Sequence, residues 1–465
     1  MSSKGLLNVR TLTLLNIVTI LSVKNWPFMA QYGLASVFFI LLPALFFFLP
    51  AALVSAELAT GWPEEGGVFV WVKNALGERF GFLAVWLMWV SNVVWYPTIL
   101  AFIAISFSYV INPAFAENKL FHFSVVNVVF WSAVFINLKG LKESSFLSSL
   151  CSILGTLLPA VLVIGFGAYW VFSGRPVLID FSWKAFIPEM KGINEWVFVT
   201  GILLGFAGIE MNAIHANNVE NPQKSYPRAI FLSTFIIVLL SVLGTLSISL
   251  VMTPEKINLA GAIIELISFY LSAYHLSIFF PLFCLLVIFG GLGSIGAWII
   301  GPNRGLTAAS QDGKYLPKPL CSLDRNGLPR RLMLFQAVIV TVLSSVFLIF
   351  PSMNLAFWIL IALASQLYLI MYILMFVSGI VLRYKHPQTS RLFRIPFRNI
   401  GMWFVAGGGI FSALFAISVG FVPPQQFDSG SLVIFEMFLI LSMIVFCSFP
   451  FLSRLSFFQR SLKQT

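Results

Sequence analysis

Two hydrophobic segments of the chain are each interrupted halfway by polar residues or glycines, a pattern that could bind a small polar solute inside a membrane. The first interruption, Ser22–Trp26, comprises Ser22, Val23, Lys24, Asn25 and Trp26. The second, Gly205–Glu210, includes Gly205, Phe206, Gly208, Ile209 and Glu210. Polar backbone exposed to lipid is too costly to persist, so both interruptions must face protein or a water-filled cavity. Broken helices in corresponding positions of two halves indicate a substrate site near the middle of the membrane.

Lys24 and Glu210 are the charged side chains inside these interruptions, and each is compatible with more than one role. A cation at the bilayer centre costs about 2.5–3.5 kcal/mol on insertion scales and faces a cavity or a partner when present. Lys24 is therefore expected either to contact a transported solute or to pair with an internal carboxylate such as Glu210. Glu210 could accept a proton, hold an ammonium group, pair with Lys24, or cap the second half of its helix. His215, further along, is a weaker candidate for a proton relay.

The elements that must position these residues are membrane-spanning helices. Of the 465 residues, 59% are hydrophobic and only 10% are charged, which excludes an ordinary soluble domain. A spanning helix needs roughly 20 apolar residues, and the sequence predicts an all-α polytopic membrane protein with about twelve such helices. The predicted spans are 11–33, 34–60, 82–111, 121–138, 147–172, 196–218, 228–252, 272–300, 332–350, 354–382, 400–421 and 431–451. The first span lacks a small-residue cleavage site, so we expect it to be retained and not removed as a signal peptide.

The net charge of +11 predicts the orientation of the chain in the membrane. Most of the 28 lysines and arginines fall before the first span, in the loops after even-numbered spans, and after the last span. Excess positive charge marks the cytoplasmic side, so both termini are predicted to be cytoplasmic. This distribution accounts for the basic residues without nucleic acid as a partner, and contact with membrane lipids is expected.

The residues that commonly bind metals or perform covalent catalysis are scattered. Cys151, Cys284 and Cys447 fall in apolar spans and Cys321 in a loop, and the four histidines have no carboxylate at ligand spacing. The sequence contains no nucleotide-binding loop, catalytic triad or metalloprotease helix. We therefore expect no metal, no cofactor and no enzymatic activity, so that energy coupling would come from gradients.

The two interruptions open two candidate repeats of five helices each. Because five is odd, the second set begins on the opposite side of the membrane, as an inverted repeat requires. The predicted organisation is a cytoplasmic N-terminus (1–10), a first repeat of helices 1–5 (11–172), an external loop (173–195), a second repeat of helices 6–10 (196–383), helices 11–12 (384–451) and a cytoplasmic tail (452–465).

Three stretches of the sequence resemble the amino acid–polyamine–organocation superfamily, and within it the bacterial glutamate/γ-aminobutyrate antiporters. They are ELATGWPEEGGVFVWVKNALGERFGF at 57–82, GIEMNAIHANNVENPQKSYPRA at 208–229 and WIIGPNRGLTAASQDGKYLP at 298–317. The resemblance implies a leucine-transporter-like fold of five-plus-five inverted repeats with discontinuous helices 1 and 6 and two C-terminal helices. It also implies sodium-independent amino acid exchange at the bacterial inner membrane.

The sequence departs from this family pattern in three places. The superfamily usually has a Gly-Ser-Gly type of break in helix 1, whereas Ser22–Trp26 contains a basic residue that suits the antiporter branch. Ser294 stands where that branch carries an acidic residue in helix 8. Only 14 residues follow Phe451, so no long cytoplasmic plug of the acid-gated type is expected.

Three tyrosines complete the predicted site. Tyr96 of helix 3 and Tyr368 and Tyr372 of helix 10 resemble aromatic positions near the family's substrate path, although packing is an alternative role for each. Tyr368 and Tyr372 are four residues apart and share a helix face. The predicted substrate-binding residues are Ser22, Val23, Lys24, Asn25, Trp26, Tyr96, Gly205, Phe206, Gly208, Ile209, Glu210, Ser294, Tyr368 and Tyr372.

The sequence thus predicts an amino acid antiporter that works by alternating access. Freed N–H groups of helix 1 would take the substrate carboxylate, and freed carbonyls of helix 6 would take its ammonium. The substrates would be small-molecule amino acids, acidic, polar or γ-aminobutyrate-like, with no obligate protein partner. The alternatives are a transport-inactive sensor and a membrane-embedded enzyme on the same fold.

Overall fold

The regular elements of the computed structural model are all helices within the part of the chain that it describes. The described residues are 8–64, 66–139, 151, 153–188, 192–213, 221–310, 315–350, 353–424 and 432–452. Among them, eleven helices are long and apolar enough to cross a membrane, and a bent pair at the start of the chain makes a twelfth span. The predicted all-α polytopic fold with about twelve spans is confirmed.

The helices follow the predicted spans closely. In chain order they are α1 (Val9–Ile20), η1 (Val23–Asn25) and α2 (Trp26–Ala30); η2 (Gly33–Ala35), α3 (Ser36–Pro43), η3 (Ala44–Phe48) and α4 (Leu49–Gly61); α5 (Val68–Leu76); α6 (Glu78–Ile111); η4 (Pro113–Glu117); α7 (Lys119–Lys139); η5 (Ile153–Leu157) and α9 (Leu158–Phe172); α10 (Trp183–Phe186); η6 (Ile193–Trp196), α11 (Val199–Gly205) and α12 (Ile209–Ala213); α13 (Pro222–Ser249); η8 (Pro254–Lys256) and α14 (Ala262–Ala273); η9 (Ser277–Phe279) and α15 (Phe280–Ser310); α16 (Arg330–Ser344) and α17 (Val346–Ile349); α18 (Met353–Lys385); α19 (Arg398–Val419); and α20 (Leu432–Leu452).

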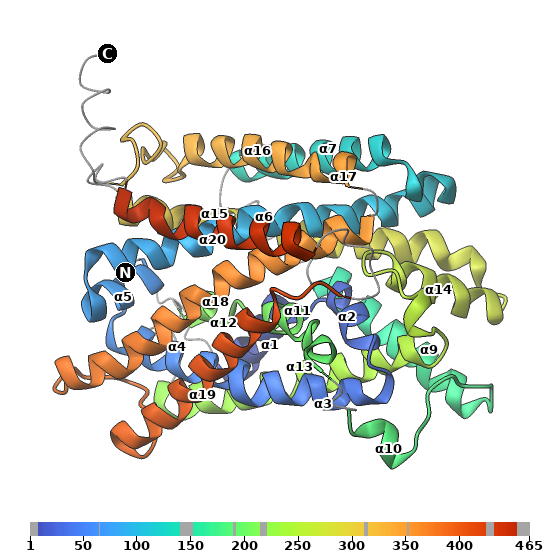
Figure 1. The fold of residues 1–465 in the computed structure, drawn as a ribbon, viewed down its shortest axis with the longest axis horizontal. Coiled ribbons are helices and arrows are strands. Elements are labelled where there is room, and N and C mark those ends of the chain that lie inside the picture. The colour runs from blue at the N-terminus through green and yellow to red at the C-terminus, as the bar shows by residue number, and fades with distance from the viewer. Residues whose placement is uncertain are drawn as a thin grey trace.

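Two long helices form the centre of the packing. α6 packs along both α15 and α18, while α1 packs along α13. The buried fraction of an apolar 18-residue window differs among the spans. It is 83% in α18 and 72% in α6, but only 17% in Phe435–Leu452 of α20. Figure 1 shows α1, α2, α11 and α12 in the middle of the bundle, and α7 and α16 along one outer face. The core therefore surrounds the two interrupted spans, and α20 is the least buried of the described spans.

The first span is broken where the sequence predicts. α1 ends at Ile20, and the chain resumes as the 3₁₀ turn η1 and then α2, which is bent by 45° from α1. Pro27 occupies the first turn of α2, where its missing N–H is tolerated. Trp26 packs against Gly244 of α13 so closely that a Cβ there would lie 2.3 Å from the indole ring. The unwound residues are thus Leu21 and Ser22, slightly earlier than predicted.

The sixth span is broken between α11 and α12, at Phe206–Gly208. Gly208 adopts a φ of +114°, and a Cβ at this position would lie 2.8 Å from the ring of Trp298, so a larger residue would be both strained and obstructed. Glu210 lies in the first turn of α12, as predicted. His215 lies outside the described residues. The two breaks are separated by five crossings, which agrees with opposite orientations of the two halves; the repeat boundaries remain a prediction.

Candidate functional site

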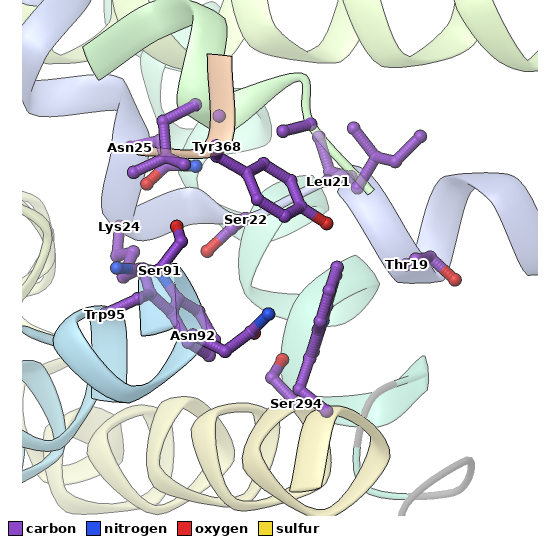
Figure 2. A pocket seen from close by; sticks show the side chains of 15 residues that line it. Thr19, Leu21, Ser22, Lys24, Asn25, Ser91, Asn92, Trp95, Ser294 and Tyr368 are labelled. Atoms are coloured by element: carbon purple, nitrogen blue, oxygen red, sulfur yellow. The ribbon is translucent and has the colours of Figure 1, made fainter. Parts of the chain in front are cut away.

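A cavity of about 70 Å³ lies between the two breaks. A buried water needs roughly 10–15 Å³, so the cavity has room for several groups of a small solute. It is lined by Thr19, Ile20, Leu21, Ser22, Lys24, Asn25, Ser91, Asn92, Trp95, Leu204, Gly205, Ala207, Ser294, Trp298 and Tyr368. Figure 2 shows Ser22 and Tyr368 on one side of this space and Asn92 and Ser294 on the other. Spans 1, 3, 6, 8 and 10 therefore all contribute to it.

Main-chain groups at both breaks are free to bind a ligand. The amide N–H groups of Ser22 and Lys24 donate to no carbonyl of the described residues. The carbonyl oxygens of Gly205 and Ala207 likewise accept no backbone hydrogen bond from this part of the chain. All four residues line the cavity. Buried backbone groups usually have hydrogen-bond partners, so these donors and acceptors of cavity-lining residues are candidates for contact with a ligand.

Lys24 contributes an amino group to the cavity. Its side chain is buried, and Nζ donates a hydrogen bond of 3.1 Å to Thr98 Oγ1. The same Nζ atom lies 5.0 Å from the centre of the Trp95 ring and 5.7 Å from that of Phe357, within the range of cation–π attraction. Figure 2 shows Lys24 beside Trp95. Lys24 makes no ion pair with any described residue, so the pairing with Glu210 that the sequence left open is not formed in this structure.

Glu210 is held by the two tyrosines of α18. Tyr368 donates to Glu210 Oε1 at 2.5 Å, and Tyr372 donates to Glu210 Oε2. The N–H of Gly208 in turn donates to the Tyr372 hydroxyl at 2.8 Å. Tyr368 lines the cavity, whereas Glu210 and Tyr372 do not. Glu210 therefore links the second break to span 10. It also holds the hydroxyl of Tyr368, although Glu210 itself does not line the cavity.

The remaining predicted residues divide into two groups. Asn25 and Ser294 line the cavity, as do Ser22, Lys24, Gly205 and Tyr368 discussed above. Val23, Trp26, Phe206, Gly208, Ile209 and Tyr96 do not line it. Tyr96 is buried and lies 5.0 Å from the ring of Phe130, centre to centre. Consecutive residues of an α-helix point about 100° apart, and Trp95, not Tyr96, faces the cavity.

The sequence predicted Tyr96 of span 3 as a site residue but did not indicate the three residues of this span that line the cavity. Ser91, Asn92 and Trp95 all line the cavity from α6. Asn92 donates from Nδ2 to the carbonyl of Met88 at 2.8 Å, and Ser91 donates to the carbonyl of Ala364 at 2.7 Å. These bonds leave the Asn92 carbonyl oxygen and the Ser91 lone pairs as acceptors. The adjacent polar pair within the apolar run WVSNVVW was the signal that could have indicated this face.

Aromatic rings pack together beside α2 and α11. Phe28 and Phe198 lie 5.9 and 5.1 Å from the ring of Trp358, centre to centre. All three side chains are buried, and a Cβ on Gly201 would touch Trp358 at 3.4 Å. Phe28 lies in α2, Phe198 lies directly before α11, and Trp358 lies in α18. They form a buried aromatic cluster beside the two breaks.

Comparison with known proteins agrees with this architecture. Residues 7–446 match the amino acid permease family. The chain is 39% identical to an uncharacterized transporter of Legionella pneumophila over 450 residues, which are 97% of each protein. It is 32% identical over 440 residues to a glutamate/gamma-aminobutyrate antiporter of Lactococcus lactis, covering 93% of this chain and 87% of that protein. The chain therefore belongs to the amino acid permease family, in the amino acid–polyamine–organocation superfamily of membrane transporters.

Proposed function

We propose that this protein is a sodium-independent antiporter that exchanges amino acids by alternating access, with the substrate held in the cavity between the two breaks. The α-carboxylate would accept hydrogen bonds from the N–H groups of Ser22 and Lys24. The α-ammonium would donate to the carbonyl oxygens of Gly205 and Ala207. Broken helices supply these complementary partners because each break frees main-chain groups near the middle of the membrane.

The charge of the cavity supports a substrate with an acidic or polar side chain, or a γ-aminobutyrate-like one. Among the lining residues, Lys24 is the one lysine, arginine, aspartate or glutamate. Glu210 does not line the cavity, and its two carboxylate oxygens accept hydrogen bonds from Tyr368 and Tyr372. A substrate with two cationic groups would meet an unshielded positive charge and no carboxylate in the lining. The relative in Lactococcus lactis that carries glutamate and gamma-aminobutyrate in its name fits this chemistry.

The same lysine supports independence from sodium. In its protonated form, Lys24 places a positive charge beside the main-chain groups of span 1. Two like charges a few ångströms apart repel strongly where the effective dielectric constant is low. A second cation at this break is therefore disfavoured. We further propose that both ends of the chain face the cytoplasm of a bacterial inner membrane, because the basic residues gather on that side.

Counterflow into proteoliposomes tests this function. Vesicles loaded with one unlabelled amino acid would take up a labelled one, with glutamate, glutamine, γ-aminobutyrate, leucine, arginine and putrescine compared in sodium and in choline buffers. We expect exchange of acidic, polar or γ-aminobutyrate-like substrates, equal in the two buffers. A sodium requirement or a preference for putrescine would refute the proposal. Saturable binding without any exchange would favour the sensor, and chemical conversion of a substrate would favour the enzyme.

A further inference from the structure

We propose that Thr98, a residue that does not line the cavity, positions the Lys24 ammonium for contact with the anionic group of the substrate, an inference that rests on the proposed function. Thr98 lies in α6, and Lys24 lies in the η1 turn of span 1. Both side chains are buried, and Lys24 Nζ lies 3.1 Å from Thr98 Oγ1. Thr98 therefore links the break in span 1 to the long central helix α6.

The hydroxyl of Thr98 is oriented as an acceptor. Its single proton is donated to the carbonyl oxygen of Trp95, three residues earlier, at 2.7 Å. The side of Oγ1 that faces Lys24 can then offer only a lone pair. An ammonium group has three donors and no acceptor, so this geometry suits a charged lysine.

The other neighbours of the ammonium hold it less directionally. The rings of Trp95 and Phe357 attract the charge from 5.0 and 5.7 Å, and no described carboxylate pairs with it. A lysine side chain has a flexible four-carbon stem. Thr98 takes one of the three N–H donors, while Lys24 itself lines the cavity. The remaining donors are available to a carboxylate there, and the fixed hydrogen bond determines where they point.

Replacement of Thr98 by valine tests the inference, because valine keeps the shape but removes the acceptor. Hydrogen bonds to charged groups are worth enough that their loss should raise the KM for an anionic substrate roughly 10- to 100-fold. We expect a much smaller rise for a neutral substrate and a Vmax within about threefold of the wild type. Thr98→Ser should restore the wild-type KM. Thr341→Val is the matched control, since Thr341 also accepts a hydrogen bond, from Trp131 Nε1 at 3.1 Å, on α16.

The double variant with Lys24→Met separates positioning from a merely structural role. If Thr98 acts through Lys24, Thr98→Val should add little to the KM change of Lys24→Met. The inference is overturned if Thr98→Val lowers Vmax equally for all substrates at unchanged KM, or if its full effect persists without Lys24. A wild-type protein that binds amino acids but does not exchange them would refute the proposed transport function. The role of Thr98 would then still be tested, by comparing the dissociation constants of the same variants.

Discussion

Glu57 of α4 should hold α4, α18 and the segment before α19 together, which makes its removal the most quantitative test of the fold. Arg383 of α18 donates from Nε to Glu57 Oε1 at 2.7 Å and from Nη2 to Oε2 at 2.5 Å. The N–H of Ile395, in the segment before α19, donates to Oε2 at 2.8 Å, and Arg391 Nε lies 3.5 Å from Oε1. The side chains of Glu57, Arg383 and Arg391 are each only 1% exposed.

Glu57→Gln keeps the size of the side chain but leaves two buried arginines without their carboxylate. Breaking a buried ion pair by removing one partner costs about 3–5 kcal/mol. At roughly 1.4 kcal/mol per factor of ten, the ratio of folded to unfolded protein should fall by about two to four orders of magnitude. Replacing Arg383 by methionine in the same chain removes one of the stranded charges, so the double variant should recover part of the loss.

The free energy of unfolding would be measured by titration with a denaturing detergent, with tryptophan fluorescence as the signal. Glu64→Gln provides the control, because Glu64 is exposed and lies only seven residues further along the chain. It should change stability by less than about 0.5 kcal/mol. A Glu57→Gln protein that unfolds at the same detergent concentration as this control would refute the reasoning, as would a double variant less stable than Glu57→Gln alone.

Three further predictions follow from the site and the loops. Lys24→Met should lower Vmax/KM for anionic substrates at least tenfold relative to neutral ones; an unchanged ratio in counterflow would contradict this. Gly208→Ala should destabilise the protein by about 1–3 kcal/mol through its φ of +114°, whereas Gly165→Ala, with nothing within 4 Å, should not. Burial raises the pKa of the Cys321 thiol, which keeps it protonated at neutral pH, so its alkylation should be slow and accelerate as the pH rises. A cysteine replacing the exposed Ser322 should react faster than Cys321 at neutral pH. In intact cells it should react with a membrane-impermeant reagent only after permeabilisation, and labelling without permeabilisation would refute the cytoplasmic assignment.

The spans were predictable because each carries its own hydrophobic signal. A stretch of roughly 20 apolar residues identifies a spanning helix without knowledge of its neighbours. The ends were less predictable, as α15 shows: the predicted span stopped at residue 300, whereas the helix continues to Ser310. Helical hydrogen bonds do not end at the edge of the apolar stretch, and charged residues such as Arg304 can extend a helix into water. The breaks were predictable because Lys24 and Glu210 place charged side chains in the middle of such segments.

The partners of the site residues could not be predicted in the same way. Lys24 and Glu210 are the obvious ion pair in the sequence, yet Glu210 meets Tyr368 and Tyr372 and Lys24 meets Thr98. These contacts depend on which faces of α6 and α18 turn toward the breaks. A rotation of α6 by about 100°, the angle between consecutive residues, decides whether Trp95 or Tyr96 lines the cavity. Because α6 and α18 are hydrophobic on nearly every side, their sequence periodicity does not indicate which face turns toward the breaks.

Protection of a cysteine at Ser294 by substrate is the most direct test that amino acids bind in the cavity between the breaks. In a chain whose native cysteines are replaced, the alkylation rate of Ser294→Cys would be measured against the concentration of an exchanged amino acid. We expect protection that saturates at the concentration that half-saturates exchange. A cysteine at Leu285, exposed on the same helix, should not be protected. The proposed site would be contradicted if the Ser294→Cys protein exchanges amino acids but saturating substrate does not change its labelling rate.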